Sequence, residues 1–250
     1  VVGTGTWTIV SGTGGSFVDD KDAATDFNGT AGTTYVLRWT IANGVCAASE
    51  DLVTIRFDQT PSAAVAGTDI EQCNNSTFTL NATNPGIGTG VWSVFAGTAT
   101  ITNANSFNTS VTGVPVGSSA TLRWTVSNGS CASTTDDVIL TNRSNPTATL
   151  SSNDADNTIC SGQSVIFTAG GGTNFEFFVN GSSVQNGAGT TYTTSALLHG
   201  QVVTVRVTDG FGGSALSAGI TTTVNTAPVA SILSSDADNS ICGGSSVTFT

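Results

Sequence analysis

Hydrophobic and polar residues alternate along several short stretches of this chain. Tyr35, Leu37, Trp39 and Ile41 share one side of the first stretch, and Val36, Arg38 and Thr40 take the other. The same alternation places apolar residues at positions 122, 124 and 126, and again at positions 203, 205 and 207. A period of two predicts strands with one face in a core and one face in water, as in an antiparallel sandwich.

The strand sequences recur at a fixed spacing. Residues 37–41 (LRWTI) return as residues 122–126 (LRWTV), 85 positions later, and residues 43–47 return at the same offset. A second pair of matching stretches begins at Leu150 and at Leu233, and each ends in a cysteine. Self-similarity of this length indicates a tandem array of modules, each of roughly 83 residues.

Prolines mark the predicted boundaries, because Pro61, Pro146 and Pro228 each follow one apolar strand and precede the next. Linkers of a few residues predict modules strung end to end. The predicted modules are a partial first module over 1–59 that lacks its opening strands, a complete second module over 60–144, a complete third module of another subtype over 145–226, and the opening strands of a fourth over 227–250. Half a sandwich exposes its apolar face and strand edges, so we expect neighbouring sequence to complete the two partial modules.

Turn signals follow the predicted strands. Asn, Asp and Gly tolerate the positive φ that a two-residue hairpin requires. The pairs are Asn43-Gly44, Asn128-Gly129, Asn180-Gly181 and Asp209-Gly210. Seven or so short strands in each module predict an immunoglobulin-like sandwich. The predicted fold class is therefore all-β, with tandem immunoglobulin-like antiparallel β-sandwich modules arranged end to end.

The composition argues against two classes of partner, nucleic acids and membranes. Six Lys and Arg residues in 250, with a net charge of −11, cannot form a stripe that tracks phosphates, so we expect no nucleic-acid partner. The longest apolar runs have the length of a strand, which predicts no insertion into a membrane.

Catalytic groups are sparse, and the sequence predicts that the chain is not an enzyme. The one histidine, His199, stands in a turn before Gly200, and no cluster of His and Cys accompanies it. The acidic pairs at 50–51 and 136–137 are adjacent along outer strands, which favours a solvated edge over the two flanking acids of a glycosidase.

Two interpretations of the tryptophans compete. Sugars stack on exposed aromatic faces, whereas the regular phase of the tryptophans with neighbouring aliphatic residues favours a buried core. The residues are Trp7, Trp39, Trp92 and Trp124.

Five cysteines are distributed over the modules. Cys73 comes just before a strand and Cys131 just after the hairpin of the same module, and we predict a disulfide between them. Cys46 and Cys242 occupy the corresponding positions in partial modules, so we expect their partners outside this sequence. Cys160 has no counterpart after the Asp209 hairpin, and we expect a buried free thiol there. Regular disulfides indicate an oxidising, extracellular compartment.

Acidic turns are the only candidate site that repeats. Each lies between the first strand of a module and its cysteine, and carboxylate and amide oxygens of this kind bind Ca²⁺. Asp and Asn also form turns by bonding the local backbone, so calcium ligation and a simple Asx-turn both remain open. The residues are Asp154, Asp156 and Asn157 in one turn, and Asp236, Asp238 and Asn239 in the other.

Several motifs resemble the tandem repeats of very large SprB-type surface adhesins from gliding bacteria that use type IX secretion. The resemblance rests on residues 5–12 (GTWTIVSG), 34–41 (TYVLRWTI), 43–46 (NGVC), 175–181 (FEFFVNG) and 202–210 (VVTVRVTDG). It implies a filamentous adhesin at the cell surface. The secretion and motility machinery is expected to contact regions of the protein outside these 250 residues. The family commonly has a cysteine after the last hairpin, where this chain has Gly212-Gly213.

Two functions are compatible with these patterns. The first is a passive adhesin stalk that extends a binding tip or binds weakly many times over. The expected partners are extracellular surfaces or polysaccharides and neighbouring modules. The second is a set of glycan-binding modules, which would require an exposed aromatic platform.

Overall fold

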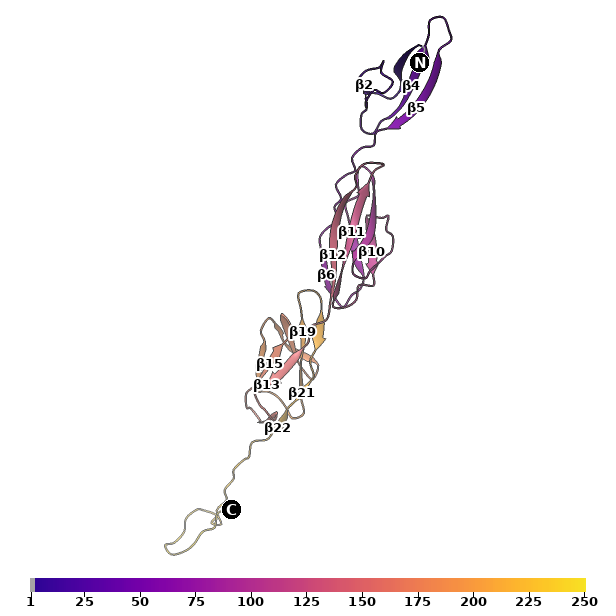
Figure 1. Ribbon diagram of the computed structural model, residues 1–250. Helices are drawn as coiled ribbons and strands as arrows, with labels where there is room; N and C mark the ends of the chain where they lie inside the picture. The colour runs from indigo at the N-terminus through magenta and orange to yellow at the C-terminus, as the bar shows by residue number, and fades with distance from the viewer. Residues whose placement is uncertain (1–2) are drawn as a thin grey trace. The chain divides into compact units, whose positions relative to one another are not determined.

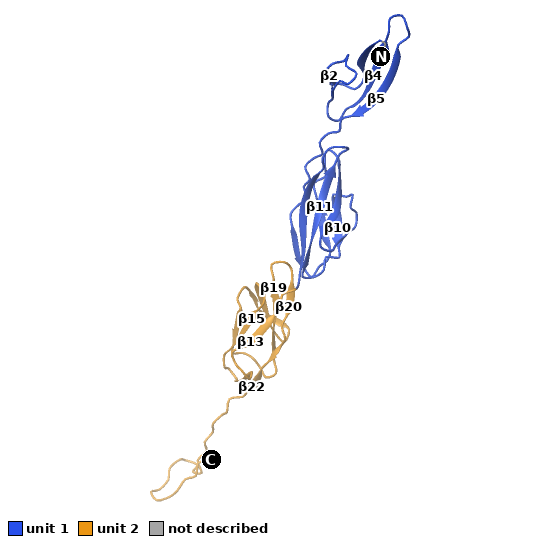
Figure 2. Ribbon diagram, in the orientation of Figure 1, with its two compact units in different colours: residues 1–144 blue, residues 145–250 orange. Residues whose placement is uncertain are grey.

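The computed structural model describes residues 3–250, and the described residues form strands without any helix (Figure 1). Contacts divide the chain into two compact units, Val1–Ser144 and Asn145–Thr250 (Figure 2). The predicted all-β class of immunoglobulin-like sandwiches is confirmed by the strand pairing within each unit.

The first module contains one three-stranded sheet and a short ribbon. The sheet has the order β1 (Thr4–Ser11), β4 (Thr34–Ala42), β5 (Ser49–Arg56), and the ribbon joins β2 (Ser16–Phe17) to β3 (Phe27–Asn28). Tyr35 and Leu37 are fully buried, as their phase predicts. The ring of Tyr35 packs edge-on against Phe27 and Phe57, with centroids 4.9 and 5.8 Å away. An aromatic cluster therefore forms the core of this module.

The second module is a two-layered sandwich. One sheet has the order β6 (Ile70–Cys73), β12 (Thr134–Arg143), β11 (Ser118–Ser127), β8 (Thr89–Ala96). The other has the order β7 (Phe78–Asn81), β10 (Asn108–Thr112), β9 (Thr100–Ile101). Strand β6 runs parallel to β12, while the remaining neighbours are antiparallel. This parallel edge decides where Cys73 lies.

Residues from both layers build the core of the second module. Leu122, Trp124 and Val126 on β11 are buried, and the intervening Arg123 and Thr125 are only partly covered. Phe78 and Val111 from the opposite sheet belong to the same buried cluster. Burial of this apolar surface is the main force that holds the two layers together.

The third module belongs to the second compact unit, and its strands show the same alternation of buried and exposed residues. Its strands are β13 (Thr149–Ser152), β15 (Val165–Gly170) and β18 (Thr191–Thr194) in one sheet; β17 (Ser182–Gly187), β16 (Asn174–Val179), β19 (Val202–Thr208), β20 (Ser214–Leu216) and β21 (Ile220–Thr221) in another; and the parallel pair β14 (Thr158–Cys160) and β22 (Thr223–Asn225). Val203, Val205 and Val207 are fully buried, whereas Arg206 faces out. Residues 227–250 end in a loose hairpin, in which Leu233 and Thr250 exchange two backbone hydrogen bonds.

The hairpins differ from one another in length. Asn180 and Gly181 alone connect β16 to β17 with φ of 45° and 80°, which confirms the predicted two-residue turn. The same prediction for Asn128-Gly129 is wrong, because six residues separate β11 from β12. Cys131 N donates to Asn128 O at 3.2 Å, which closes a four-residue turn with only Gly129 at positive φ. Asn43-Gly44 has the same six-residue form, and five residues follow β19 after Thr208.

Candidate functional site

Paired tryptophans occupy equivalent places in the first and second modules. Trp92 lies opposite Trp124 across β8 and β11, with ring centroids 5.0 Å apart and an interplanar angle of 45°. Both rings are buried, at 2% and 1% exposure. A sugar ring therefore cannot stack on their faces, and the core interpretation of these two tryptophans is confirmed.

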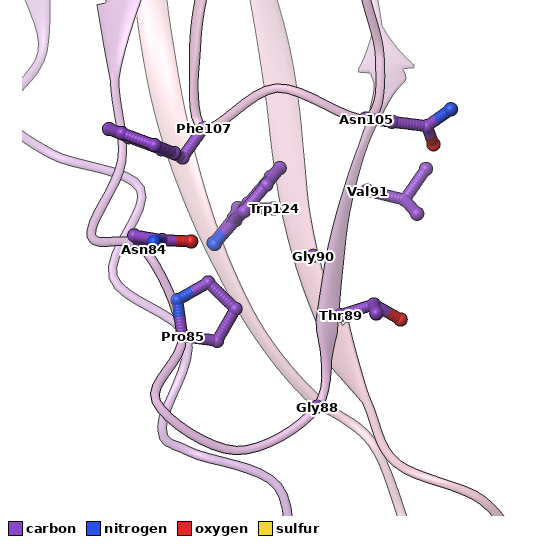
Figure 3. Close-up of a pocket in the computed structure, with 9 residues that line it drawn as sticks. All are labelled: Asn84, Pro85, Gly88, Thr89, Gly90, Val91, Asn105, Phe107 and Trp124. Atoms are coloured by element: carbon purple, nitrogen blue, oxygen red, sulfur yellow. The ribbon is translucent and has the colours of Figure 1, made fainter.

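A hollow of about 430 Å³ opens beside the edge of the Trp124 indole. Figure 3 shows Asn84, Pro85 and Phe107 around that ring, with Gly90 on the neighbouring strand. A Cβ at Gly90 would lie 1.9 Å from the Trp124 ring, so only glycine leaves room for the indole there. Within the described part of the chain, the buried Nε1 of Trp124 has no hydrogen-bond partner. Polar side chains of Asn84 and Asn105 also line the hollow, and Trp124 itself is 1% exposed, so its indole belongs to the core.

Charged and aromatic side chains meet on the outer face of the second module. Arg123 forms a two-pronged ion pair with Asp137 at 2.8 Å for each contact. Its guanidinium also lies 3.7 Å from the ring centroid of Phe95, which is 58% exposed. Hydrogen bonds from Arg123 lower the pKa of Asp137, since they favour the ionised carboxylate. This surface carries the exposed aromatic ring that the tryptophans do not provide.

The third module repeats this outer-face arrangement with different residues. Arg206 forms an ion pair with Glu176 and lies 5.2 Å from the ring centroid of Phe178. The apolar hollow beside it is completed by Thr204 and Leu216. In the first module, Arg38 pairs with Glu50 at 3.5 Å, but Val10 stands where Phe95 stands 85 positions later. The arginine and carboxylate are thus shared by three modules, and the aromatic ring by two.

The acidic turn at Asp154 binds its own backbone. Asp156 N donates to Asp154 Oδ1 at 3.3 Å, and Thr158 N donates to Asp156 Oδ1 at 3.0 Å. Asn157 adopts a φ of 54°, and its carbonyl oxygen accepts from Thr223 N at 2.8 Å. These contacts define consecutive Asx-turns, which asparagine and aspartate favour.

The second acidic turn has the same form. Asp238 N donates to Asp236 Oδ1 at 3.1 Å, Ser240 N donates to Asp238 Oδ1 at 3.0 Å, and Asn239 has a φ of 57°. A hydrogen bond from Asp238 is the main cause that lowers the pKa of Asp236. No group of three His, Cys, Asp or Glu side chains among residues 3–250 is placed to hold a metal ion. Calcium binding stays a prediction.

The predicted disulfide between Cys73 and Cys131 is wrong. Cys73 pairs with Arg143 at the last position of β12, whereas Cys131 lies three residues before Thr134, where β12 begins. A ten-residue strand spans about 30 Å, and a disulfide requires Cα atoms within about 7 Å. No bond joins the two sulfurs. The error arose because the sequence does not show that β6 runs parallel to β12.

Cys160 was predicted to be a buried free thiol, and the prediction that it is buried is wrong. Cys160 ends β14 with an exposed side chain, while the preceding Ile159 is buried. Strand alternation places neighbouring residues on opposite faces, so only one of the two can enter the core. Cys46 and Cys242 are exposed as well.

His199 has a local structural contact. Its Nδ1 accepts a hydrogen bond from Val224 N at 3.3 Å, which links the turn before β19 to β22. His199 lies in a turn, as the sequence predicts.

A linker aspartate that the sequence patterns did not single out forms several polar contacts at the boundary between the first and second modules. Asp58 Oδ2 accepts hydrogen bonds from Ser130 N at 2.8 Å and Ser130 Oγ at 3.2 Å. Its other oxygen pairs with Arg56 Nε at 2.6 Å, and the side chain is 9% exposed. The backbone hydrogen bond from Ser130 is the main cause that lowers the pKa of Asp58. Linker and hairpin therefore form one hydrogen-bonded structure, which we call the Asp58 clasp.

Two further contacts belong to the Asp58 clasp. Asn128 Nδ2 donates to Gln59 O at 2.8 Å, and the sulfur of Cys131 lies 3.5 Å from Asp58 O. A Cβ at Gly129 would lie 1.8 Å from Asp58 Oδ2, so the close approach requires glycine. The glycine at position 129 was the one signal of this close contact in the sequence. A glycine is also expected in a turn, so its presence did not point to the linker.

No protein-family model and no curated protein matches the sequence. Among solved structures, the chain is similar to murine CEACAM1b, with 11% identity over 62% of this chain and 96% of that one, at a TM-score of 0.36. It is also similar to mouse cadherin-23 EC22–24, with 14% identity over 90% and 86% and a TM-score of 0.37. The fibronectin(III)-like modules of Clostridium thermocellum CbhA show 15% identity over 67% and 93%, at 0.34. At scores of this size we infer nothing about function from these proteins.

None of the described residues forms a helix long and apolar enough to cross a membrane.

Proposed function

We propose that this chain is a non-enzymatic repeat region of a large secreted cell-surface adhesin, which acts as a stalk and as a weak multivalent binder. The Asp58 clasp is the observation that carries this proposal. A spacer must transmit position from one module to the next, and Asp58, Gln59 and Asn128 connect the linker to the following hairpin by hydrogen bonds. A linker held in this way has far less freedom than a flexible tether.

The SprB-type motifs support a particular setting for such a stalk. Residues 34–41 and 43–46 carry the resemblance in the first module, and their equivalents recur in the second. In the structure residues 34–41 lie on β4, which carries Trp39 of the tryptophan pair, and residues 43–46 belong to the hairpin after it. The equivalent hairpin of the second module is the one that takes part in the Asp58 clasp. We propose an extracellular location at the surface of a gliding bacterium, export by type IX secretion, and partners among extracellular surfaces or polysaccharides.

Binding of single and clustered chains tests the stalk and weak-binder function. Weak sites gain apparent affinity only when many copies act together. We expect beads that carry many copies of the full chain to adhere to polysaccharide-coated surfaces, while a single chain in solution shows no saturable binding by calorimetry. Tight binding of one chain to one soluble glycan would contradict the weak-binder function and favour the second candidate.

Glycan-binding modules are the second candidate, because Phe95 is exposed and lies against Arg123. An aromatic face beside a fixed guanidinium suits a sugar that carries hydroxyl groups. Phe95→Ala should then abolish binding to the same polysaccharide. Ile139→Ala provides the matched control, since Ile139 is also exposed and lies on β12, which β11 separates from the β8 strand of Phe95. Equal binding by both variants would exclude this platform.

A further inference from the structure

The 85-residue repeat makes the two module boundaries comparable residue by residue. Val36 pairs with Thr54 in the first module, and Thr121 pairs with Ile139 in the second, so the corresponding residues of the two pairs are 85 positions apart. Pro61 and Pro146 keep the same offset. Asp58 is therefore the first module's equivalent of Arg143.

The backbone oxygen of Arg143 has a defined partner. Strand β6 runs beside the end of β12, and Asn74 N donates to Arg143 O at 2.8 Å. Asn74 directly follows Cys73. In a first module completed with the β6–β12 register of the second, the residue after the equivalent cysteine would donate to Asp58 O.

Asp58 O already has a sulfur beside it. The sulfur of Cys131 lies 3.5 Å from this oxygen. In the second module the sulfur of Cys73 lies 3.8 Å from Ser144 O, and Ser144 is the equivalent of Gln59, the residue after Asp58. A cysteine at the position equivalent to Cys73 would therefore lie beside the same two linker residues that the hairpin of the second module contacts. The same comparison explains why Cys73 and Cys131 are far apart within one module, because each lies at the opposite end of β12.

Exposure of the hairpin cysteines agrees with this placement. Cys131 is partly covered, whereas the equivalent Cys46 is exposed and has no linker against it among the described residues. Gly44 shows the same contrast, since a Cβ there would meet nothing within 4 Å. The linker is therefore what brings a backbone to the hairpin cysteine.

We propose that Cys131 forms a disulfide with the opening-strand cysteine of the preceding module, at the position equivalent to Cys73. The bond would connect one module to the next instead of closing a loop within one. Two thiols lose two protons and two electrons to form it, and a disulfide oxidant such as oxidised glutathione takes them up as two thiols. In the cell the bond rests on the proposed extracellular location, but its formation by purified protein does not.

An extended chain tests the proposal directly. Residues 60–85 are copied in front of Val1, because residue 86 is the equivalent of Val1 in the repeat. The extended protein is folded in a buffer of reduced and oxidised glutathione and mapped by mass spectrometry without reduction. We expect the added cysteine to be bonded to Cys131, and Cys131→Ser to leave it reduced. A bond from the added cysteine to Cys46 would overturn the proposal in favour of a bond within one module.

A second measurement decides the matter if the added segment does not fold. In the unextended chain, alkylation of Cys131 by iodoacetamide should be several-fold slower than that of Cys46, and Asp58→Ala should bring the two rates together. Equal rates in the unaltered chain would show that the linker does not lie on Cys131, and the proposal would fall. Adhesion by beads, as described above, is independent of either result.

Discussion

The first and second modules show how far one sequence motif determines its surroundings. Trp7 and Trp39 have ring centroids 5.1 Å apart at 45°, almost the geometry of Trp92 and Trp124. Yet Trp39 is only partly buried, whereas Trp124 is 1% exposed. The strand sequence fixes the pair, and the second sheet, which the first module has only as the short β2–β3 ribbon, supplies the burial.

The hairpins of these two modules differ in the same way. Gly44 and Gly129 both have a φ of 56°, and Cys46 and Cys131 both donate their N–H back to the asparagine that opens the turn. Of these two hairpins, the second is covered by a linker, and the first has none against it in the described part of the chain. Local sequence therefore determines the turn, whereas the neighbouring segment determines the chemistry of its cysteine.

Replacing the tryptophans should show the largest difference between the modules. Trp124→Ala removes a fully buried ring, which costs about 3–5 kcal/mol in a packed core. Trp39→Ala should cost clearly less, because its ring is already partly in water. Hydrogen exchange by mass spectrometry, read on peptides from β11 and β4, measures the free energy of opening of each module. Equal losses in both modules would mean that the ribbon alone suffices to bury Trp39.

Alanine at the two hairpin glycines isolates the Asp58 clasp. A residue with a Cβ at positive φ costs about 1–2 kcal/mol, and this cost applies equally to Gly44→Ala and Gly129→Ala. The second variant also displaces Asp58 Oδ2, with which the new Cβ would collide. We expect Gly129→Ala to lose more stability and to speed cleavage of the 58–61 linker by a protease, while Gly44→Ala leaves that cleavage rate unchanged. Identical cleavage rates in the two variants would argue against a clasp.

Acidification should weaken the boundary between the first and second modules through Asp58. Its pKa lies below the ordinary value of 3.8 because Ser130 and Arg56 favour the carboxylate. The stabilisation is therefore fully present above pH 3.8 and is lost as the pH falls through the lower pKa of the folded state. Asp58→Asn should remove this part of the pH dependence. Linker cleavage by pepsin from pH 4 down to pH 2 measures it, and parallel profiles for the two proteins would contradict the assignment.

Strand positions could be predicted from the sequence because they depend on alternation alone. Leu122, Trp124 and Val126 were assigned to the core by phase, and all three are buried. The positions of Cys73 and Cys131 could not be predicted, because they depend on the parallel pairing of β6 with β12, and strand order is not a local property. The number of residues between Cys73 and Cys131 is the same whether the two cysteines lie at one end of the sheet or at opposite ends. The sequence therefore does not tell these two arrangements apart.

The boundary contacts were hidden for a similar reason. Asp58 follows a strand as any linker residue does, and its partner Ser130 lies 72 positions away. The six-residue hairpin loop was missed because Asn128-Gly129 suits a short turn equally well, and only the Cys131 N–H contact to Asn128 O shows the longer form. The acidic turns were predictable as Asx-turns, since Asp and Asn bond to backbone groups two residues away.

Calcium should have the smallest effect on the chain. Asp154 and Asp156 already accept backbone N–H groups, and their turn offers no third acidic ligand among the described residues. We therefore expect the melting temperature of the full chain to be the same in calcium and in chelator. Asp156→Ala removes the acceptor for Thr158 N and should cost about 0.5 kcal/mol in both conditions, as loss of one exposed hydrogen bond does. Asp51→Ala is the matched control, because among residues 3–250 the Asp51 side chain accepts a hydrogen bond only from the adjacent Leu52 N. A calcium-dependent rise in melting temperature that disappears in Asp156→Ala but persists in Asp51→Ala would instead establish a calcium site at this turn, because an ion that binds only the folded protein stabilises it by mass action.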